Sequence, residues 1–239
     1  MPYEHILYDL RGNVAVITIN RPQTLNALHS DAFRELMRAY REAEADDNVR
    51  VIIATGAGDR AFCTGWDLNE ASKVSAAAAD PSFDVREAQN VTDRFYTGLF
   101  TTKPVIGAIN GYAIAGGFEY LLMCDLVVAS ETAQFGLQEV RWAIMPGGGG
   151  TVRLPRKVPA NIANEIVLMG DRFDAATAHR FGLANWVVPP EQVMPKALEV
   201  AATLCKRGPL GVRSAKRSLG NAVDMQLQAA IQEEQRLFG

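Results

Sequence analysis

In three segments of this chain, glycine residues stand between a short apolar run and a helical pattern. This repeated arrangement restricts the possible folds. The segments are Thr55–Glu70, Ile109–Asp125 and Gln138–Leu154. The runs before the first two, Val49–Gly56 and Pro104–Asn110, have the length and β-branching of buried strands. Strands that alternate with helices in this way predict an α/β protein.

The other elements follow from local signals. A turn at Arg11-Gly12-Asn13 predicts a hairpin of Tyr3–Leu10 with Val14–Ile19, and Ser30 is a candidate N-cap for a helix. The remaining expected elements are a mobile loop at Ser75–Ser82, helices at Val85–Phe100, Phe118–Met123, Ala160–Met169 and Ala175–Phe181, and strands at Leu126–Ser130 and Asn185–Val188. Helices then dominate, so we expect a core domain over 1–188 and a C-terminal helical region over 189–239.

The composition excludes several classes of function. The 239 residues carry a formal net charge of −3, which gives no general attraction to nucleic acid or anionic membrane. Two basic stretches, Arg153–Lys157 and Lys206–Arg217, are more typical of a solvated surface than of a phosphate contact.

Cysteine and histidine give no sign of a disulfide framework or a metal site. The three cysteines form no CxxC pair and are odd in number, which fits a reducing compartment. The three histidines have no ligand spacing, so no metal is expected. We find no leader pattern and no apolar run long enough to span a bilayer, and we expect a cytoplasmic protein.

A glycine pattern after the first predicted buried strand imitates a dinucleotide-binding fingerprint. Gly56, Gly58 and Ala61 have its spacing. That fingerprint requires a helix to begin at once, and the next residues, 62–65 (FCTG), are poor helix formers. We therefore do not expect a nicotinamide cofactor.

Glu119 is the one charged residue in an otherwise apolar helical segment. An arbitrary helical glutamate usually reaches solvent or pairs with an arginine. Here it follows Gly116-Gly117, where backbone N–H groups could hold negative charge on a ligand oxygen. A carboxyl group in such surroundings would have a raised pKa, suited to moving protons near neutrality.

Glu139 is less conspicuous by itself. Composition alone favours a surface glutamate near Arg141. The run Gly147–Gly150 that follows fits either a plain flexible loop or a set of amides that position a ligand.

Four motifs together resemble the enoyl-CoA hydratase/isomerase family, also called the crotonase family. They are "NRPQTLNAL" (Asn20–Leu28), "AFCTGWDL" (Ala61–Leu68), "INGYAIAGGFEYLLMCD" (Ile109–Asp125) and "FGLQEVRWAIMPGGGGTVRLPR" (Phe135–Arg156). They occur in the order and with the spacing of that family. The resemblance implies a spiral of ββα units, with a C-terminal helical region that forms trimers, which commonly pair into hexamers.

The resemblance also implies a catalytic set. The backbone N–H groups of Trp66 and Gly116 would hold the oxygen of a thioester enolate. Glu119 would be the base on the water side, Glu139 the acid at C2, and the amide of Gly147 would help to hold the water. The expected reaction is hydration of a 2-enoyl-CoA.

By the same resemblance, Leu25, Ala27, Thr64, Asp67 and Leu68 would enclose coenzyme A, which enters as part of the substrate rather than as a separate cofactor. Gln23 and Asn69 stand where some relatives carry lysine, and Trp66 is bulky where many hydratases have alanine or glycine. Relatives usually continue beyond the final "EEQRLFG" through a further helix that covers a pocket.

Two alternatives remain open. One lies inside the family: an enoyl-CoA isomerase, a dehydratase of a carnitinyl-type acyl-CoA or a hydratase–lyase. The glutamate pair argues against isomerases that use one carboxylate. The other is a non-catalytic protein that binds RNA or CoA, against which the acidic balance and the intact pair count. We expect no nucleic-acid or membrane partner.

Overall fold

In the middle of the chain, over residues 51–136, successive strands alternate between two sheets. The computed structural model describes residues 2–70, 72 and 101–238. Its six-stranded sheet has the order β1-β2-β3-β5-β7-β10, and its four-stranded sheet has the order β4-β6-β8-β9. Each of β3 (Val51–Gly56), β5 (Val105–Ile109) and β7 (Leu126–Ser130) in the first sheet precedes a strand of the second, namely β4 (Ala61–Cys63), β6 (Tyr112–Ile114) and β8 (Gln134–Gly136).

This alternation is a spiral of ββ-helix units and confirms the predicted α/β class. The helix α4 (Gly116–Leu121) follows β6, and the 3-10 helix η2 (Glu139–Trp142) follows β8. Because β4, β6 and β8 are parallel neighbours, the segments that follow their carboxyl ends meet at one edge of the small sheet. The predicted loop at Ser75–Ser82 and helix at Val85–Phe100 lie outside the described residues.

The predicted hairpin is present as β1 (Ile6–Arg11) paired antiparallel with β2 (Val14–Ile19). The helix α1 (Ser30–Ala45) follows. The expectation that Ser30 is its N-cap is wrong, since Ser30 is the first helical residue and His29 is the cap. The His29 Nδ1 accepts a hydrogen bond from the Ala32 N–H at 3.0 Å, while the Ser30 backbone N–H donates to Glu70.

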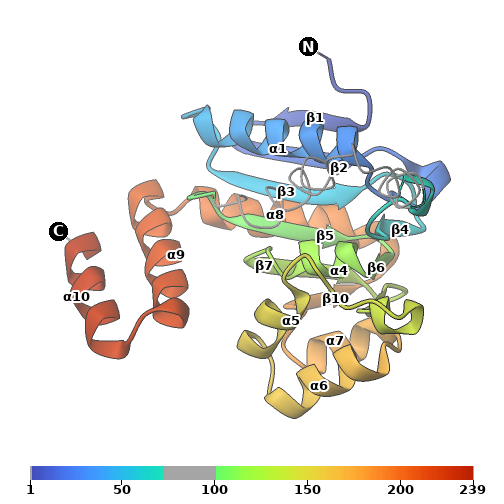
Figure 1. Cartoon of the computed structure of the whole chain (residues 1–239). Helices are drawn as coiled ribbons and strands as arrows, with labels where there is room; N and C mark the ends of the chain where they lie inside the picture. Colours follow the sequence, from blue (N-terminus) through green and yellow to red (C-terminus); the bar gives the residue numbers. More distant parts are fainter. Residues whose placement is uncertain (1, 71, 73–100, 239) are drawn as a thin grey trace, which may run out of the picture.

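Both faces of the central strands of the large sheet are buried, which explains why β3 and β5 are almost entirely apolar instead of alternating with polar residues. Ala15, Ile17 and Ile52 pack on the face that α1 covers. Val16 and Ile53 face the other way, against α8 (Val193–Cys205). Figure 1 shows α1 and α8 on opposite sides of β2 and β3.

Two further predicted helices are observed close to their expected bounds. The helix α6 has the predicted bounds, Ala160–Met169, and is capped by Gly170 in a left-handed conformation, while α7 (Ala175–Arg180) ends one residue early. The remaining elements are η1 (Pro22–Thr24), α5 (Gly150–Arg153), η3 (Leu154–Arg156), β9 (Phe173–Asp174), β10 (Trp186–Val188) and η4 (Pro190–Gln192).

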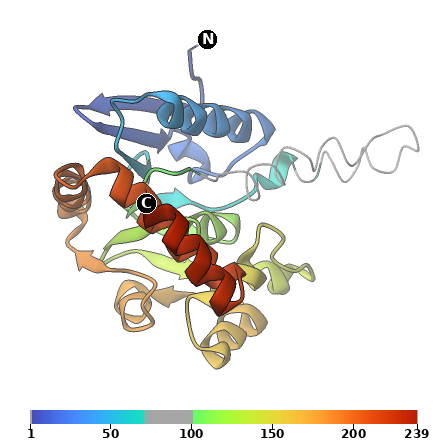
Figure 2. The same cartoon turned by 90° about the vertical axis from the view of Figure 1, so that its left-hand side faces the viewer.

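The last two helices, α9 (Pro209–Asp224) and α10 (Leu227–Phe238), pack on each other and extend away from the sheets (Figure 1). Figure 2 shows α10, the dark red helix, in front of the core. The helix α8 lies against the sheet although it follows residue 188, and the expected division of the chain at that residue stays a prediction. None of the described helices is both long enough and apolar enough to cross a membrane.

Candidate active site

Glu119 lies inside the core and not at the surface. The residue is only 3% exposed, so its side chain does not extend into bulk solvent. It also forms no ion pair with an arginine among the described residues. Instead its Oε1 accepts hydrogen bonds from the backbone N–H groups of Gly148 and Gly150, at 2.7 and 2.8 Å. No described residue is hydrogen-bonded to Oε2, which leaves that oxygen available to a water molecule or a ligand.

Arg153 holds the loop that supplies these amides. Its Nη1 donates to the Gly148 carbonyl at 2.9 Å. Gly149 has a φ of +97°, a conformation that favours glycine, and a Cβ on it would lie 2.0 Å from that same Nη1, so a larger residue there would be strained and would displace the Arg153 side chain. Burial raises the pKa of Glu119, while the amides of Gly150 and Gly148 and the charge of Arg153 oppose that rise.

Glu139 is buried too, at the start of η2, and its surroundings differ from those of Glu119. Its Oε2 has no hydrogen-bond partner among the described residues. Burial is the main cause that raises its pKa to about 7; the charge of Glu119 acts in the same direction, and a backbone hydrogen bond opposes the shift. Arg141, the neighbour expected to pair with a surface glutamate, instead contacts Asp171 at 3.4 Å.

The two carboxyl groups therefore have different partners, although burial raises the pKa of both. Glu119 receives two N–H donors and a nearby guanidinium, which stabilise its carboxylate. Glu139 has an orphaned oxygen next to a negative charge, which stabilises its neutral acid. A carboxylate beside a carboxylic acid can take a proton from one atom of a ligand and give a proton to another.

The peptide of Trp66 is fixed by a parallel bridge to Leu28. The Leu28 N–H donates to the Gly65 carbonyl at 2.8 Å, and the Asp67 N–H donates to the Leu28 carbonyl at 2.9 Å. In a trans peptide the C=O and the N–H point in opposite directions. Because the Gly65 carbonyl points toward Leu28, the Trp66 N–H must point away from it.

Gly65 brings this peptide close to Gly116. Its φ is +89°, and a Cβ there would lie 2.7 Å from the Gly116 nitrogen. Glycine is therefore required for the backbone conformation and for the close approach. The indole of Trp66 packs against Phe33 of α1, with ring centroids 5.7 Å apart, and its Nε1 is buried without a partner in the described part of the chain.

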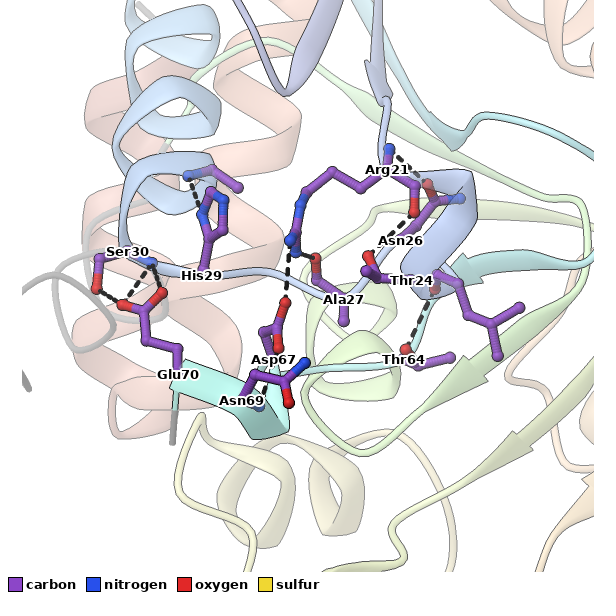
Figure 3. A network of polar contacts seen from close by, with 12 residues as sticks. Arg21, Thr24, Asn26, Ala27, His29, Ser30, Thr64, Asp67, Asn69 and Glu70 are labelled. Carbon is purple, nitrogen blue, oxygen red and sulfur yellow. Dashed lines mark hydrogen bonds and ion pairs between the residues drawn. The ribbon is translucent and has the colours of Figure 1, made fainter. Parts of the chain in front are cut away.

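The five residues expected around coenzyme A come from two segments that lie side by side (Figure 3). Thr64 Oγ1 donates to the Leu25 carbonyl at 3.2 Å, and Ala27 and Asp67 share a contact with Arg21. Leu68 is 76% exposed, which suits a residue that covers a ligand. The Asp67 carboxylate, in contrast, is buried and turned to Arg21.

Sequence reasoning missed Gly148, Gly150 and Arg153, although the glycine run was the signal for the first two. Gly147 borders open space, since a Cβ on it would meet no atom within 4 Å. A cavity of about 610 Å³ lies elsewhere, between the segment 122–126 that follows α4, the side chains of Arg153 and Lys157, and α9, and it is lined by none of the expected site residues. The basic stretches carry ion pairs with acidic groups, among them Lys216 with Asp125 at 2.6 Å and Arg217 with Glu233 at 3.2 Å.

Comparison with known proteins gives one consistent family. The model of a family described as enoyl-CoA hydratase/isomerase matches residues 9–239. The chain is 35% identical to a short-chain-enoyl-CoA hydratase of Clostridium acetobutylicum, over 100% of this chain and 90% of that protein. It is 39% identical to a carnitinyl-CoA dehydratase of Proteus mirabilis, over 86% and 76% of the two chains. A crystal structure of an enoyl-CoA hydratase from Bacillus anthracis superposes with a TM-score of 0.90 at 36% identity, covering 98% of this chain and 90% of that one.

Proposed function

Because this chain belongs to the enoyl-CoA hydratase/isomerase family, we propose that it is an enoyl-CoA hydratase, a hydro-lyase that adds water across the 2,3 double bond of a 2-enoyl-CoA thioester. The observation that carries the proposal is the buried pair of Glu119 and Glu139 with unlike surroundings. The relatives named as hydratases support the same activity.

In this proposal Glu119 is the base. Its carboxylate takes a proton from a water molecule, the water oxygen bonds to C3 of the substrate, and the electrons of the double bond move to the thioester oxygen as an enolate. Glu139 then gives its proton to C2. The site resets when the proton on Glu119 returns to Glu139 by way of solvent. The amide of Gly147 is assigned to the water molecule, and there is open space beside the Gly147 Cα, where a Cβ would meet no atom within 4 Å.

The backbone N–H groups of Trp66 and Gly116 are the proposed donors to the enolate oxygen. Support comes from the orientation of the Trp66 peptide and the close approach of Gly65 to Gly116. Loss of one such donor costs about 3 kcal/mol of transition-state stabilisation in enzymes that use this device. Leu25, Ala27, Thr64, Asp67 and Leu68 are assigned to the segments that enclose coenzyme A.

Coenzyme A is part of the substrate in this proposal, and no separate cofactor takes part.

We assign the protein to the cytoplasm, and we propose that it assembles as a homotrimer or as a hexamer of two trimers. Support for assembly comes from α9 and α10, which expose large apolar side chains. These are Leu210, Leu219, Val223, Leu227, Ile231 and Phe238.

Dehydration of a carnitinyl-type acyl-CoA is the second candidate. The same acid and base operate in reverse on a 3-hydroxyacyl thioester, and a relative with that activity in its name is 39% identical. A panel of enoyl-CoA and hydroxyacyl-CoA substrates separates the two, because the preferred substrate has the highest kcat/KM.

The first test is the consumption of crotonyl-CoA, followed by loss of the absorbance of its conjugated double bond. We expect the wild-type protein to hydrate it, and Glu119→Gln and Glu139→Gln each to reduce kcat by about 100-fold or more, as for lost general acid–base groups. An exposed glutamate variant, Glu131→Gln, is the control. Full activity in both site variants would contradict the proposed mechanism.

A further inference from the structure

Arg21 is buried where an arginine would usually reach solvent. It lies two residues after the end of β2, its side chain is about one-tenth exposed, and its guanidinium contacts two segments at once. Nη2 donates to Asp67 Oδ2 at 3.0 Å, and Nη1 donates to the carbonyl of Ala27 (Figure 3). A planar fork of donors can make both contacts together, whereas a lysine ammonium cannot span them in the same way.

The two contacts lie immediately beside the bridge that orients the Trp66 peptide. Ala27 precedes Leu28, and Asp67 follows Trp66, while Leu28 and Trp66 are the bridged pair. The Asp67 backbone N–H is itself the donor to Leu28 at 2.9 Å. Arg21 therefore links the two segments next to the peptide whose N–H points away from Leu28.

Other contacts hold the same segments in register. Thr64 Oγ1 donates to the Leu25 carbonyl at 3.2 Å, and these two residues precede Trp66 and Leu28, the bridged pair, in their segments. Asn26 Oδ1 accepts from the Arg21 backbone N–H at 3.0 Å, and Asn26 Nδ2 donates to the Ala61 carbonyl at 2.7 Å. The backbone around Trp66 is thus tied at both ends, with Arg21 and Asp67 as the only charged groups among these contacts.

We propose that Arg21 and Asp67 form a buried clamp that positions the Trp66 N–H for the thioester oxygen, so that both are positioning residues for the reaction. This inference rests on the proposed function. It assigns the Asp67 carboxylate to the clamp, and leaves only the Asp67 backbone to line a CoA site.

Charge and geometry support the clamp. Burial raises the pKa of Asp67, but the hydrogen bonds from Arg21 and from the Asn69 N–H, with the Arg21 charge, hold it below its ordinary value. Asp67 is therefore ionised at neutral pH. A backbone donor cannot be deleted by changing its own side chain, and small displacements of such a donor cost catalysis steeply. Arg21 is a side chain through which the Trp66 donor can be displaced.

The experiment compares Arg21→Lys and Asp67→Asn with Arg34→Lys, a control in an exposed ion pair of α1. For crotonyl-CoA we expect both clamp variants to lower kcat by about 10- to 100-fold, as for a weakened oxyanion donor. KM should change by less than about threefold, since an interaction made in the transition state affects kcat. The control should match the wild type.

A second readout reports the hydrogen bond itself. Bound 4-(dimethylamino)cinnamoyl-CoA absorbs at longer wavelength when its thioester carbonyl accepts strong hydrogen bonds. We expect the wild type and Glu119→Gln to shift this absorption, and Arg21→Lys to shift it less. An unchanged shift in both clamp variants, with unchanged kcat, would mean that Arg21 and Asp67 only stabilise the fold. A raised KM with unchanged kcat would mean that they only hold the CoA segments.

The outcomes separate the clamp from the proposed function. A wild-type protein that shifts the chromophore without hydrating crotonyl-CoA contradicts the function, and the variants still test the clamp. Hydrogen exchange needs no substrate. We expect the Asp67 amide to exchange faster in both clamp variants than in the control, and equal exchange rates would contradict the clamp.

Discussion

At the residue scale, the two glutamates differ in what surrounds them and not in chemistry. Glu119 is held by amides that lie 29 and 31 residues further along the chain. The sequence located both carboxyl groups through the motifs around them. It could not assign these donors, because which amide reaches Oε1 depends on how the loop after η2 returns to α4.

Arg153 illustrates the same limit. It belongs to a basic stretch that composition assigns to a solvated surface. In the structure its guanidinium is bonded to the Gly148 carbonyl, behind the amide that contacts Glu119. The nearby Arg156 contacts the Val152 carbonyl at an exposed position. The two arginines differ because the glycine loop folds back against Arg153, and the sequence alone does not show this.

The raised pKa of Glu139 has a consequence for stability. Its folded pKa of about 7 lies above the ordinary 4.5, so the folded state binds its proton more tightly than the unfolded state does. That contribution is fully present below pH 4.5 and is lost as the pH rises through 7. At about 1.4 kcal/mol per pKa unit, the loss is about 3 kcal/mol.

We therefore expect Glu139→Gln to be more stable than the wild type at pH 8, by up to about 3 kcal/mol, and this gain to shrink toward pH 4.5. Urea unfolding at several pH values measures it. Glu131→Gln, at an exposed position, should show no such trend. A gain that is independent of pH, or a loss that grows at high pH, would contradict the raised pKa.

At the scale of elements, the site depends on how closely β4 approaches the start of α4. Strand positions were predictable, because β-branched runs such as residues 51–56 and 126–130 have few alternatives. The helix boundary at Ser30 was wrong because Glu70, distant in sequence, accepts from the Ser30 N–H, and the cap role falls to His29.

Gly65→Ala tests the close approach. The new Cβ would lie 2.7 Å from the Gly116 nitrogen and would force a left-handed φ of +89° on alanine. We expect kcat to fall at least about tenfold through the displaced oxyanion donors, and the free energy of unfolding to fall by about 1–3 kcal/mol.

Gly12→Ala is the matched control, because Gly12 also has a positive φ of +60° but a Cβ there meets nothing within 4 Å. It should lose stability and keep its activity. Equal kcat in the two variants would show that the approach of Gly65 to Gly116 does not matter for the reaction.

At the scale of the whole molecule, α9 and α10 stand apart from the sheets and carry most of the exposed large apolar side chains of the C-terminal third. The sequence indicated helices here, and their amphipathic pattern could not show which face meets the core, since α8 packs on the sheet and α9 does not. Exposed apolar area of this kind usually marks an interface between protein chains.

We expect light scattering to give three or six times the chain mass of 26.0 kDa. Leu219→Glu, on the exposed face of α9, should lower that mass toward one chain by placing charge in the interface. Leu10→Glu, on the exposed β1 hairpin, is the control. A wild-type protein that is monomeric at assay concentrations would contradict the proposed assembly.

The most direct test of the two-carboxyl account is the kcat of the Glu119→Gln/Glu139→Gln double variant, compared with the two single variants on the same enoyl-CoA. Groups that act in one proton-transfer sequence are strongly non-additive. We therefore predict that the double variant is slower than the slower single variant by less than about tenfold. The claim that the two groups act on one substrate in one site would be contradicted by either of two results. One is a double variant whose fold-loss in kcat equals the product of the two single fold-losses, and the other is a single variant with wild-type kcat.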